Sequence, residues 1–145
     1  MNTRIATLDD AAPLAELITA FNIPFPGLLV TAEQTAARLA ACQGFETTIL
    51  AELDDRIVGF ACLRLVPYMS GDGPYAELTD LFVDAAYRRH GVAGALMAHV
   101  ERLAREAGAT EMILLTGFDN AGAQAFYRAL GYGDYALAMR RNIAP

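Results

Sequence analysis

The chain has 145 residues, of which 54% are hydrophobic and 19% charged, and its formal net charge is −6. This length fits a single domain, residues 1–145, and the apolar content excludes a disordered chain. The acidic balance argues against a nucleic-acid-binding protein and favours a cationic partner or substrate. Two cysteines without metal-site spacing indicate free thiols and no metal site. Without a membrane-spanning run or a hydrophobic signal segment, we expect a cytoplasmic protein that does not bind a membrane.

The N-terminal part predicts one short strand and two helices. Residues 4–7 form the expected strand, and Thr7 with Asp10 has the spacing of a capping box before a helix that ends near Asn22. Thr31 with Gln34 predicts the start of a second helix, which should end at Gly44. Residues 23–29 between these helices are a loop by their prolines, but an unusually apolar one, which indicates packing on the core.

The middle of the chain changes to the alternating pattern of strands. Residues 47–53 and 56–66 flank Asp54-Asp55 and predict two antiparallel strands joined by a tight turn. Cys62, in the second strand, is expected to be a small buried residue and not a nucleophile, since no partner base is identifiable. A turn-rich connection then leads to a third strand at residues 75–83.

The C-terminal part predicts two more helices. Apolar residues recur at helical spacing from Val92 until Gly108, and a second helix covers residues 121–130. Between them, residues 112–115 are a continuous apolar run that predicts a buried strand. Residues 135–140 alternate between apolar and other side chains, which predicts a final strand.

Residues 88–97 carry the clearest chemical signal. The segment follows the apolar strand end Leu81-Phe82-Val83, and small residues occupy the first turn of the predicted helix. Unpaired N–H groups at such a helix start are exposed and can bind phosphate. The basic side chains Arg88, Arg89 and His90 add positive charge there. The pattern is neither a Walker loop nor a Rossmann fingerprint, which disfavours a nucleoside-triphosphate site.

Two motifs together resemble the GCN5-related N-acetyltransferase (GNAT) family. The first is Arg-x-x-Gly-x-Ala at 88–93 after Asp-Leu-Phe-Val, with alanine where many relatives have glycine. The second lies about 30 residues further on, and its members are Asn120, Ala123, Phe126, Tyr127, Gly131 and Tyr132. The resemblance covers nearly the whole chain. It implies a single-domain α/β fold with a mixed, mostly antiparallel sheet, splayed at its centre, and about four helices packed on both faces.

The resemblance also implies that acetyl-CoA binds between the parted strands. Its diphosphate would lie on the backbone of the glycine-rich turn, and its pantetheine arm would pair with the main chain of the preceding strand. The residues expected to bind acetyl-CoA are Leu81, Phe82, Val83, Arg88, Arg89, His90, Gly91, Val92, Ala93, Gly94, Asn120, Ala123, Phe126 and Tyr127. Asn120 would also cap its helix whatever its other role. The loop at residues 23–29 would line the acceptor pocket.

Three residues are implied in catalysis by the same resemblance. Tyr127 would return a proton to the leaving thiolate, for which a phenol is suited by its high pKa. Asp80 or Glu77 would act as the general base or anchor the substrate. Strand alternation puts these two carboxylates on opposite faces unless a bulge, as in similar proteins, changes the register, so both remain candidates. Thr79 stands where relatives that acetylate diamines often carry an acid.

We therefore expect an N-acetyltransferase that moves an acetyl group from acetyl-CoA to a primary amine, on a small cationic molecule or a lysine-like peptide side chain. The acidic residues Glu52, Asp72, Glu77 and Asp80 favour a cationic acceptor. The alternative is a non-catalytic domain of the same fold that binds coenzyme A as a sensor or for a protein interaction. Similar enzymes are often homodimers, and the composition allows one.

Overall fold

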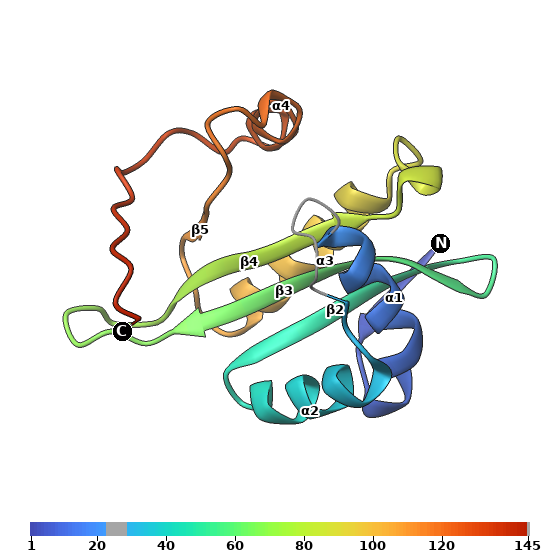
Figure 1. Ribbon diagram of the computed structural model, residues 1–145. Coiled ribbons are helices and arrows are strands. Elements are labelled where there is room, and N and C mark those ends of the chain that lie inside the picture. Colours follow the sequence, from blue (N-terminus) through green and yellow to red (C-terminus); the bar gives the residue numbers. More distant parts are fainter. Residues whose placement is uncertain (23–28, 145) are drawn as a thin grey trace. The chain divides into compact units, whose positions relative to one another are not determined.

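The computed structural model describes residues 1–22 and 29–144. A five-stranded sheet forms its framework, and Figure 1 shows how the helices lie around it. The strands lie in chain order: β1 (Asn2–Ile5), β2 (Glu46–Leu53), β3 (Arg56–Val66), β4 (Tyr75–Val83) and β5 (Met112–Leu114). β1 to β4 are antiparallel neighbours. β5 is the neighbour of β4, and α3 lies between them in the chain, which is a connection typical of parallel neighbours. The predicted mixed, mostly antiparallel fold is therefore confirmed.

The described helices also match the predicted ones closely. They are α1 (Ala11–Phe21), α2 (Ala32–Cys42), α3 (Val92–Glu106) and α4 (Ala121–Ala129), with short 3-10 helices η1 (Leu8–Asp10) and η2 (Ala85–Tyr87). None of the helices in the described ranges is both long and apolar enough to cross a membrane. The chain divides into two compact units, residues 1–113 and 114–145, and each is described by itself below.

Helices cover both faces of the sheet in the first unit. Leu14 and Leu17 of α1 belong to one buried cluster with Leu50 and Phe60 of the sheet. Gly59 precedes Phe60 in β3, and a Cβ on it would lie 3.3 Å from the Val92 side chain of α3. Because neighbouring strand residues point to opposite faces, α1 and α3 pack on opposite faces of β3.

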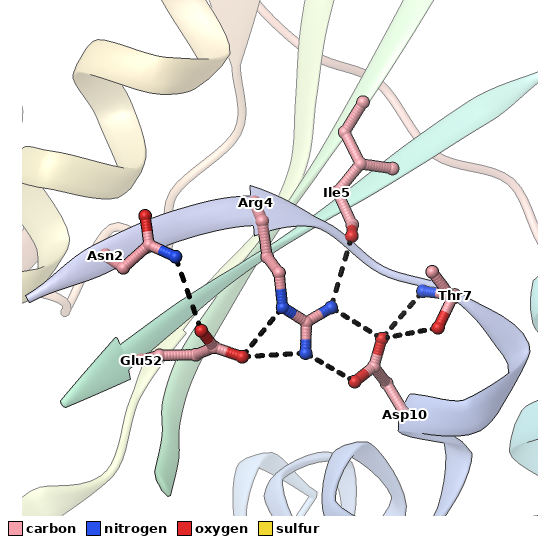
Figure 2. A network of polar contacts seen from close by, with 6 residues as sticks. All are labelled: Asn2, Arg4, Ile5, Thr7, Asp10 and Glu52. Atoms are coloured by element: carbon pink, nitrogen blue, oxygen red, sulfur yellow. Dashed lines mark hydrogen bonds and ion pairs between the residues drawn. The ribbon is translucent and has the colours of Figure 1, made fainter. Parts of the chain in front are cut away.

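A network around Arg4 fixes the N-terminal strand to its surroundings (Figure 2). Its guanidinium makes two bonds to Asp10, at 2.6 and 2.8 Å, and its Nε donates to Glu52 at 2.7 Å. The Thr7 main-chain N–H donates to Asp10 at 2.7 Å, which confirms that these two residues act together ahead of α1. The hydrogen bonds from Arg4 hold the pKa of the Asp10 carboxyl well below its usual range.

His99 also links α3 to β1. Its Nδ1 lies 2.9 Å from Thr3 Oγ1, and Arg102 donates to its Nε2 at 2.9 Å. A ring that accepts at Nε2 and donates from Nδ1 is neutral. Burial, followed by the charge of Arg102, lowers the pKa of His99 accordingly.

The prediction of a final strand at residues 135–140 is wrong. In the described part of the second unit, no strand forms after α4. Tyr135, Leu137 and Met139, which supplied the alternating pattern, are 80%, 78% and 89% exposed. A strand needs hydrogen bonds from a neighbouring strand and a surface that covers its apolar side chains. An alternating pattern alone supplies neither of them.

Candidate active site

The turn that leads into α3 presents open backbone. Gly91 and Arg89 have φ values of 80° and 62°, in the left-handed region. Such alternation of backbone conformation turns successive N–H groups toward one side and creates an anion-binding concavity. A Cβ added at Gly91 or Gly94 would meet nothing within 4 Å. Space is therefore open beside both glycines, and the phosphate site at the start of α3 stays a prediction.

The basic side chains beside this turn are exposed but oriented by the main chain. Arg88 donates from Nε to the Val83 carbonyl at 3.1 Å, and its guanidinium lies 6.0 Å from the centre of the Phe82 ring. His90 Nδ1 lies 2.9 Å from the Arg88 carbonyl. Val92 is buried, so only its main chain can contribute to binding, whereas Ala93 is half-buried. Positive charge thus gathers at the N-terminus of a helix.

At the end of β4 that precedes this turn, β5 does not extend far enough to pair with the edge that faces away from β3. On its inner edge, Phe82 and Val83 pair with β3. On the outer side, Ala76 at the start of β4 donates to the Glu111 carbonyl at 3.0 Å, and β5 has only 3 residues after Glu111. A strand of that length starting opposite Ala76 cannot reach residues 81–83. This geometry is what main-chain pairing of an extended ligand with Leu81, Phe82 and Val83 requires.

A cavity of about 320 Å³ lies on the α1 and α2 side of the sheet. This volume is at the lower end of the range for small-molecule sites. The lining combines an apolar wall with a few polar groups, and its residues are Leu14, Ile18, Phe21, Asn22, Thr35, Arg38, Leu39, Cys42, Glu46, Thr48, Phe60, Cys62 and Asp80. The apolar loop predicted to line an acceptor pocket, at residues 23–29, lies outside the described residues except for Leu29.

A bulge in β4 determines which side chains face this cavity. Asp80 pairs with Cys62, but the next pair along is Leu78 with Leu63, so Thr79 is an extra residue in β4. Directly paired residues share a face, and Cys62 and Arg64 lie on the same face of β3. Because Glu77 pairs with Arg64, the bulge brings Glu77 to the same face as Asp80.

Among these two carboxylates, only Asp80 lines the cavity. Burial raises the pKa of the Asp80 carboxyl, the charge of Glu46 raises it further, and the charge of Arg64 opposes the increase. A carboxylate with a raised pKa is a stronger base than an exposed one. Glu77 instead lies 3.4 Å from Arg64, in an ion pair whose two side chains are 25% and 47% exposed.

Two other residues considered from the sequence, Cys62 and Glu52, belong to the packing and to the ion-pair network of the fold. Cys62 is buried, and this burial raises the pKa of its thiol, so the thiol stays protonated as expected for a core residue. Glu52, one of the acidic residues taken to favour a cationic acceptor, is bound to Arg4 and does not line the cavity. Among the described residues, no group of histidine, cysteine and carboxylate side chains is placed to hold a metal ion.

In the second unit, α4 carries the second predicted motif. Asn120 is the N-cap, and its Oδ1 accepts a hydrogen bond from the Ala123 main chain at 3.1 Å. The half-buried Tyr127 ring lies 5.3 Å from the Phe126 ring and 6.0 Å from that of Tyr132, between centroids. Burial raises the pKa of the Tyr127 hydroxyl, so this group keeps its proton at neutral pH.

Two charged residues of the cavity, Glu46 and Arg38, were missed in the sequence. Glu46 precedes Thr47, where the predicted strand began, and it extends the same alternation by one position. With that extension, Glu46, Thr48 and Leu50 share one face, which could have indicated its position. Arg38 follows from no pattern in the sequence, because its approach to the sheet depends on how α2 packs.

Comparisons with known proteins agree on one family. The acetyltransferase (GNAT) family profile matches residues 14–132. Human N-acetyltransferase 8 is 35% identical over 83 residues, which are 57% of this chain and 37% of that protein. The chain thus spans about a third of the length of this curated relative.

Solved structures show the same fold. A protein of Agrobacterium tumefaciens str. C58 assigned as an acetyltransferase matches with a TM-score of 0.88 at 26% identity, over 98% of this chain and 99% of that one. An aminoglycoside acetyltransferase from an uncultured soil metagenomic sample has a TM-score of 0.83 at 20% identity, with 99% and 96% covered. The second likeness concerns the fold alone.

Proposed function

Because the chain belongs to the acetyltransferase (GNAT) family, we propose that it moves the acetyl group of acetyl-CoA to a primary amine. The observation that carries this proposal is the course of β4. Its bulge turns Asp80 into the cavity, and its far end leads through η2 to the open turn at the start of α3. In this proposal, one continuous stretch of chain would supply both a basic group for the amine and a site for a diphosphate.

Acetyl-CoA would be held mainly by main-chain groups. The N–H groups of residues 91–94 would bind the diphosphate, supported by the charges of Arg88, Arg89 and His90. The outer edge of residues 81–83, where the Val83 carbonyl already accepts from Arg88, would pair with the amides of the pantetheine arm. Asn120, Ala123 and Phe126 of the second unit stay predicted acetyl-CoA-binding residues on the strength of the family motif. Since these contacts use a pre-formed backbone, they position the thioester at little cost in side-chain entropy.

Asp80 is the best candidate for the group that accepts a proton from the amine. An ammonium group cannot attack a carbonyl carbon, because its nitrogen has no free electron pair. Asp80 would take that proton directly or through water, after which the nitrogen forms a bond to the acetyl carbon and the carbon–sulfur bond breaks. Glu77 remains an anchor candidate on the same face, although Arg64 already binds it.

Tyr127 would give a proton to the sulfur that leaves. A phenol with a raised pKa keeps its proton at neutral pH, so it can donate a hydrogen bond to the leaving sulfur and transfer its proton as another proton replaces it. The nitrogen carries an excess proton after its attack, and loss of that proton, directly or through water, restores the Tyr127 phenol. The products are then a neutral thiol and an acetylated amine, and the proton taken by Asp80 passes to solvent.

The cavity supports a cationic acceptor, either a small amine or a lysine-like side chain. Asp80 and Glu46 place two carboxyl groups in its lining, and the exposed Arg38 adds one cationic group to it. Leu14, Ile18 and Phe60 form an apolar wall that could contact the carbon chain of such an amine. A cytoplasmic location and a homodimer stay predictions.

Release of coenzyme A thiol from acetyl-CoA, measured across a broad panel of amines, tests this function. We expect amine-dependent release with at least one polyamine, amino sugar or lysine peptide, together with the acetylated product by mass spectrometry. Acetyl-CoA binding without turnover on any amine would instead support the non-catalytic alternative that Thr79 suggested.

A further inference from the structure

Beside the cavity, Glu46 of β2 connects three strands. Its Oε2 accepts a hydrogen bond from Thr79 Oγ1 of β4 at 2.9 Å and another from Arg64 Nη2 of β3 at 3.0 Å. The Glu46 side chain is only 15% exposed, whereas that of Arg64 is 47% exposed. A carboxylate so largely removed from water is stabilised by these two donors. Glu46 is thus held in one orientation at the edge of the cavity.

Thr79, its partner, is the extra residue of the β4 bulge. The Thr79 hydroxyl also lies 3.4 Å from the Cys62 carbonyl, which belongs to the residue paired with Asp80. Its side chain therefore reaches across β3 from the bulge to β2. An extra residue in a strand loses regular pairing, so a side-chain bond that replaces this pairing stabilises the bulged conformation.

We propose that Thr79 and Glu46 act together as positioning residues for the Asp80 carboxyl. Thr79 fixes the bulge that turns Asp80 toward the cavity, and Glu46 both holds the Thr79 hydroxyl and places a second negative charge near Asp80. The acid that position 79 lacks is in this way supplied from β2. The catalytic part of this inference rests on the proposed acetyl transfer, whereas the structural part concerns Asp80 alone.

The charges around Asp80 are consistent with this role. Glu46 from β2 raises the pKa of Asp80, and Arg64 from β3 lowers it. Glu77 shares the face but is paired with Arg64, and Cys62 keeps its proton. Helix α2 adds Arg38 and Cys42 to the cavity lining, while the lining residues of α1 carry no titratable group. Among the described residues, Glu46 is thus the anionic group that acts most on Asp80.

A comparison of Thr79→Val with Thr79→Ser distinguishes the effect of the hydroxyl on activity from the effect of the side-chain shape. Valine keeps the branched β-carbon that suits a strand, and serine keeps the hydrogen bond. With an amine found in the panel, we expect Thr79→Val to lower kcat about 10-fold or more, with the KM for acetyl-CoA unchanged, and Thr79→Ser to stay within about 3-fold of the unsubstituted protein. Equal activity of the two variants would overturn the role of the hydroxyl.

Glu46→Gln removes the charge but keeps an oxygen that accepts from Thr79. Carbon-13 NMR of the Asp80 carboxyl, followed from acidic to neutral pH, should show protonation at lower pH in this variant, because a neighbouring negative charge has been removed. An unchanged Asp80 titration would overturn the inference. This measurement needs no substrate, so it decides the positioning of Asp80 even if no amine is acetylated and the proposed function fails.

Discussion

Asp80 of β4 lies directly opposite Cys62 of β3, while Leu78, two positions earlier in β4, lies opposite Leu63, the very next residue of β3. The extra residue between the two pairs reverses the side-chain alternation of β4. Without it, Asp80 would point toward α3 and the apolar core on that side. The position of the candidate base thus depends on a local irregularity of one strand.

Asp80→Asn and Glu77→Gln distinguish the two candidate bases. We expect Asp80→Asn to lower kcat/KM about 100-fold, because the amide cannot accept a proton from the amine. Glu77→Gln should remain within about 3-fold, since its ion pair with the half-exposed Arg64 contributes little. Both variants are compared by thiol release at saturating acetyl-CoA. The reverse order would assign the proton transfer to Glu77.

Asp80→Asn should also change the stability of the folded protein. Folding raises the pKa of Asp80, so the folded state disfavours its ionised form. The free-energy cost of ionising Asp80 is absent below the pKa that this carboxyl has in the unfolded chain. It is fully present above the pKa that it has in the folded protein. Asp80→Asn removes a charge that is buried at a cost, and we expect its Tm to exceed that of the unsubstituted protein at pH 7. The difference should shrink as the pH is lowered toward 4. A lower Tm at pH 7 would show that the carboxylate is stabilised in the fold.

The activity of the unsubstituted protein should also depend on pH through Asp80. A base works only when it is deprotonated, and the raised pKa moves that transition above the range of an exposed aspartate. We expect kcat/KM to fall on acidification, with an apparent pKa higher than that of an exposed aspartate. Deprotonation of the acceptor amine at higher pH should add a second, alkaline limb to the pH profile of kcat/KM. The position of that limb should vary with the acceptor, whereas the position of the acidic limb should not.

Tyr127→Phe tests the proton donor. The hydroxyl is needed only when the thiolate leaves, so kcat should fall by about 10- to 100-fold, while acetyl-CoA affinity stays nearly the same. Tyr132→Phe is the matched control, because it also removes a hydroxyl from the same aromatic group. Stopped-flow turnover and calorimetric binding provide the two quantities. Unchanged turnover in Tyr127→Phe would remove this residue from the mechanism.

Arg4→Met probes the network that fixes β1. Loss of the guanidinium leaves the largely buried Asp10 carboxylate with Thr7 as its remaining donor, and we expect a cost of about 2 kcal/mol in the free energy of unfolding at pH 7. Because the folded pKa of Asp10 is lowered, this stabilisation is present above pH of about 4 and is lost on further acidification.

Arg105→Met is the control for this prediction. Arg105 forms an i,i+4 pair with Glu101 on α3, and its side chain is 66% exposed. Such a pair contributes less than about 0.5 kcal/mol, so urea unfolding should distinguish the two arginines clearly. Equal losses would mean that the Arg4 network adds no more than an ordinary surface ion pair.

Periodicity and end signals in the sequence predicted most elements of the fold. Thr31 begins α2 through its capping box with Gln34, Asp54 and Asp55 form the turn between β2 and β3, and Gly108 follows the end of α3. These features depend on a few neighbouring residues, and local preferences decide them. The final strand failed because its pattern, carried by Tyr135 and its neighbours, needs a partner that lies elsewhere in the chain.

The candidate site was less predictable for the same physical reason. The open turn at the start of α3 follows from consecutive residues, but the face of Asp80 depends on the register between β3 and β4. No residue near Thr79 signals a bulge by its type; its hydrogen bond to Glu46 connects positions far apart in sequence. Such contacts become visible only when the strands are paired.

Calorimetric titration of acetyl-CoA into the unsubstituted protein and into Gly94→Leu tests the central claim most directly. A Cβ at position 94 meets no neighbouring atom, and leucine favours a helix, so the variant should keep its Tm while its side chain covers the open turn. We predict binding to the unsubstituted protein and an affinity about 10-fold or more lower for the variant, as expected when a phosphate loses its main-chain donors. Equal affinities, or no binding to either protein, would contradict the account.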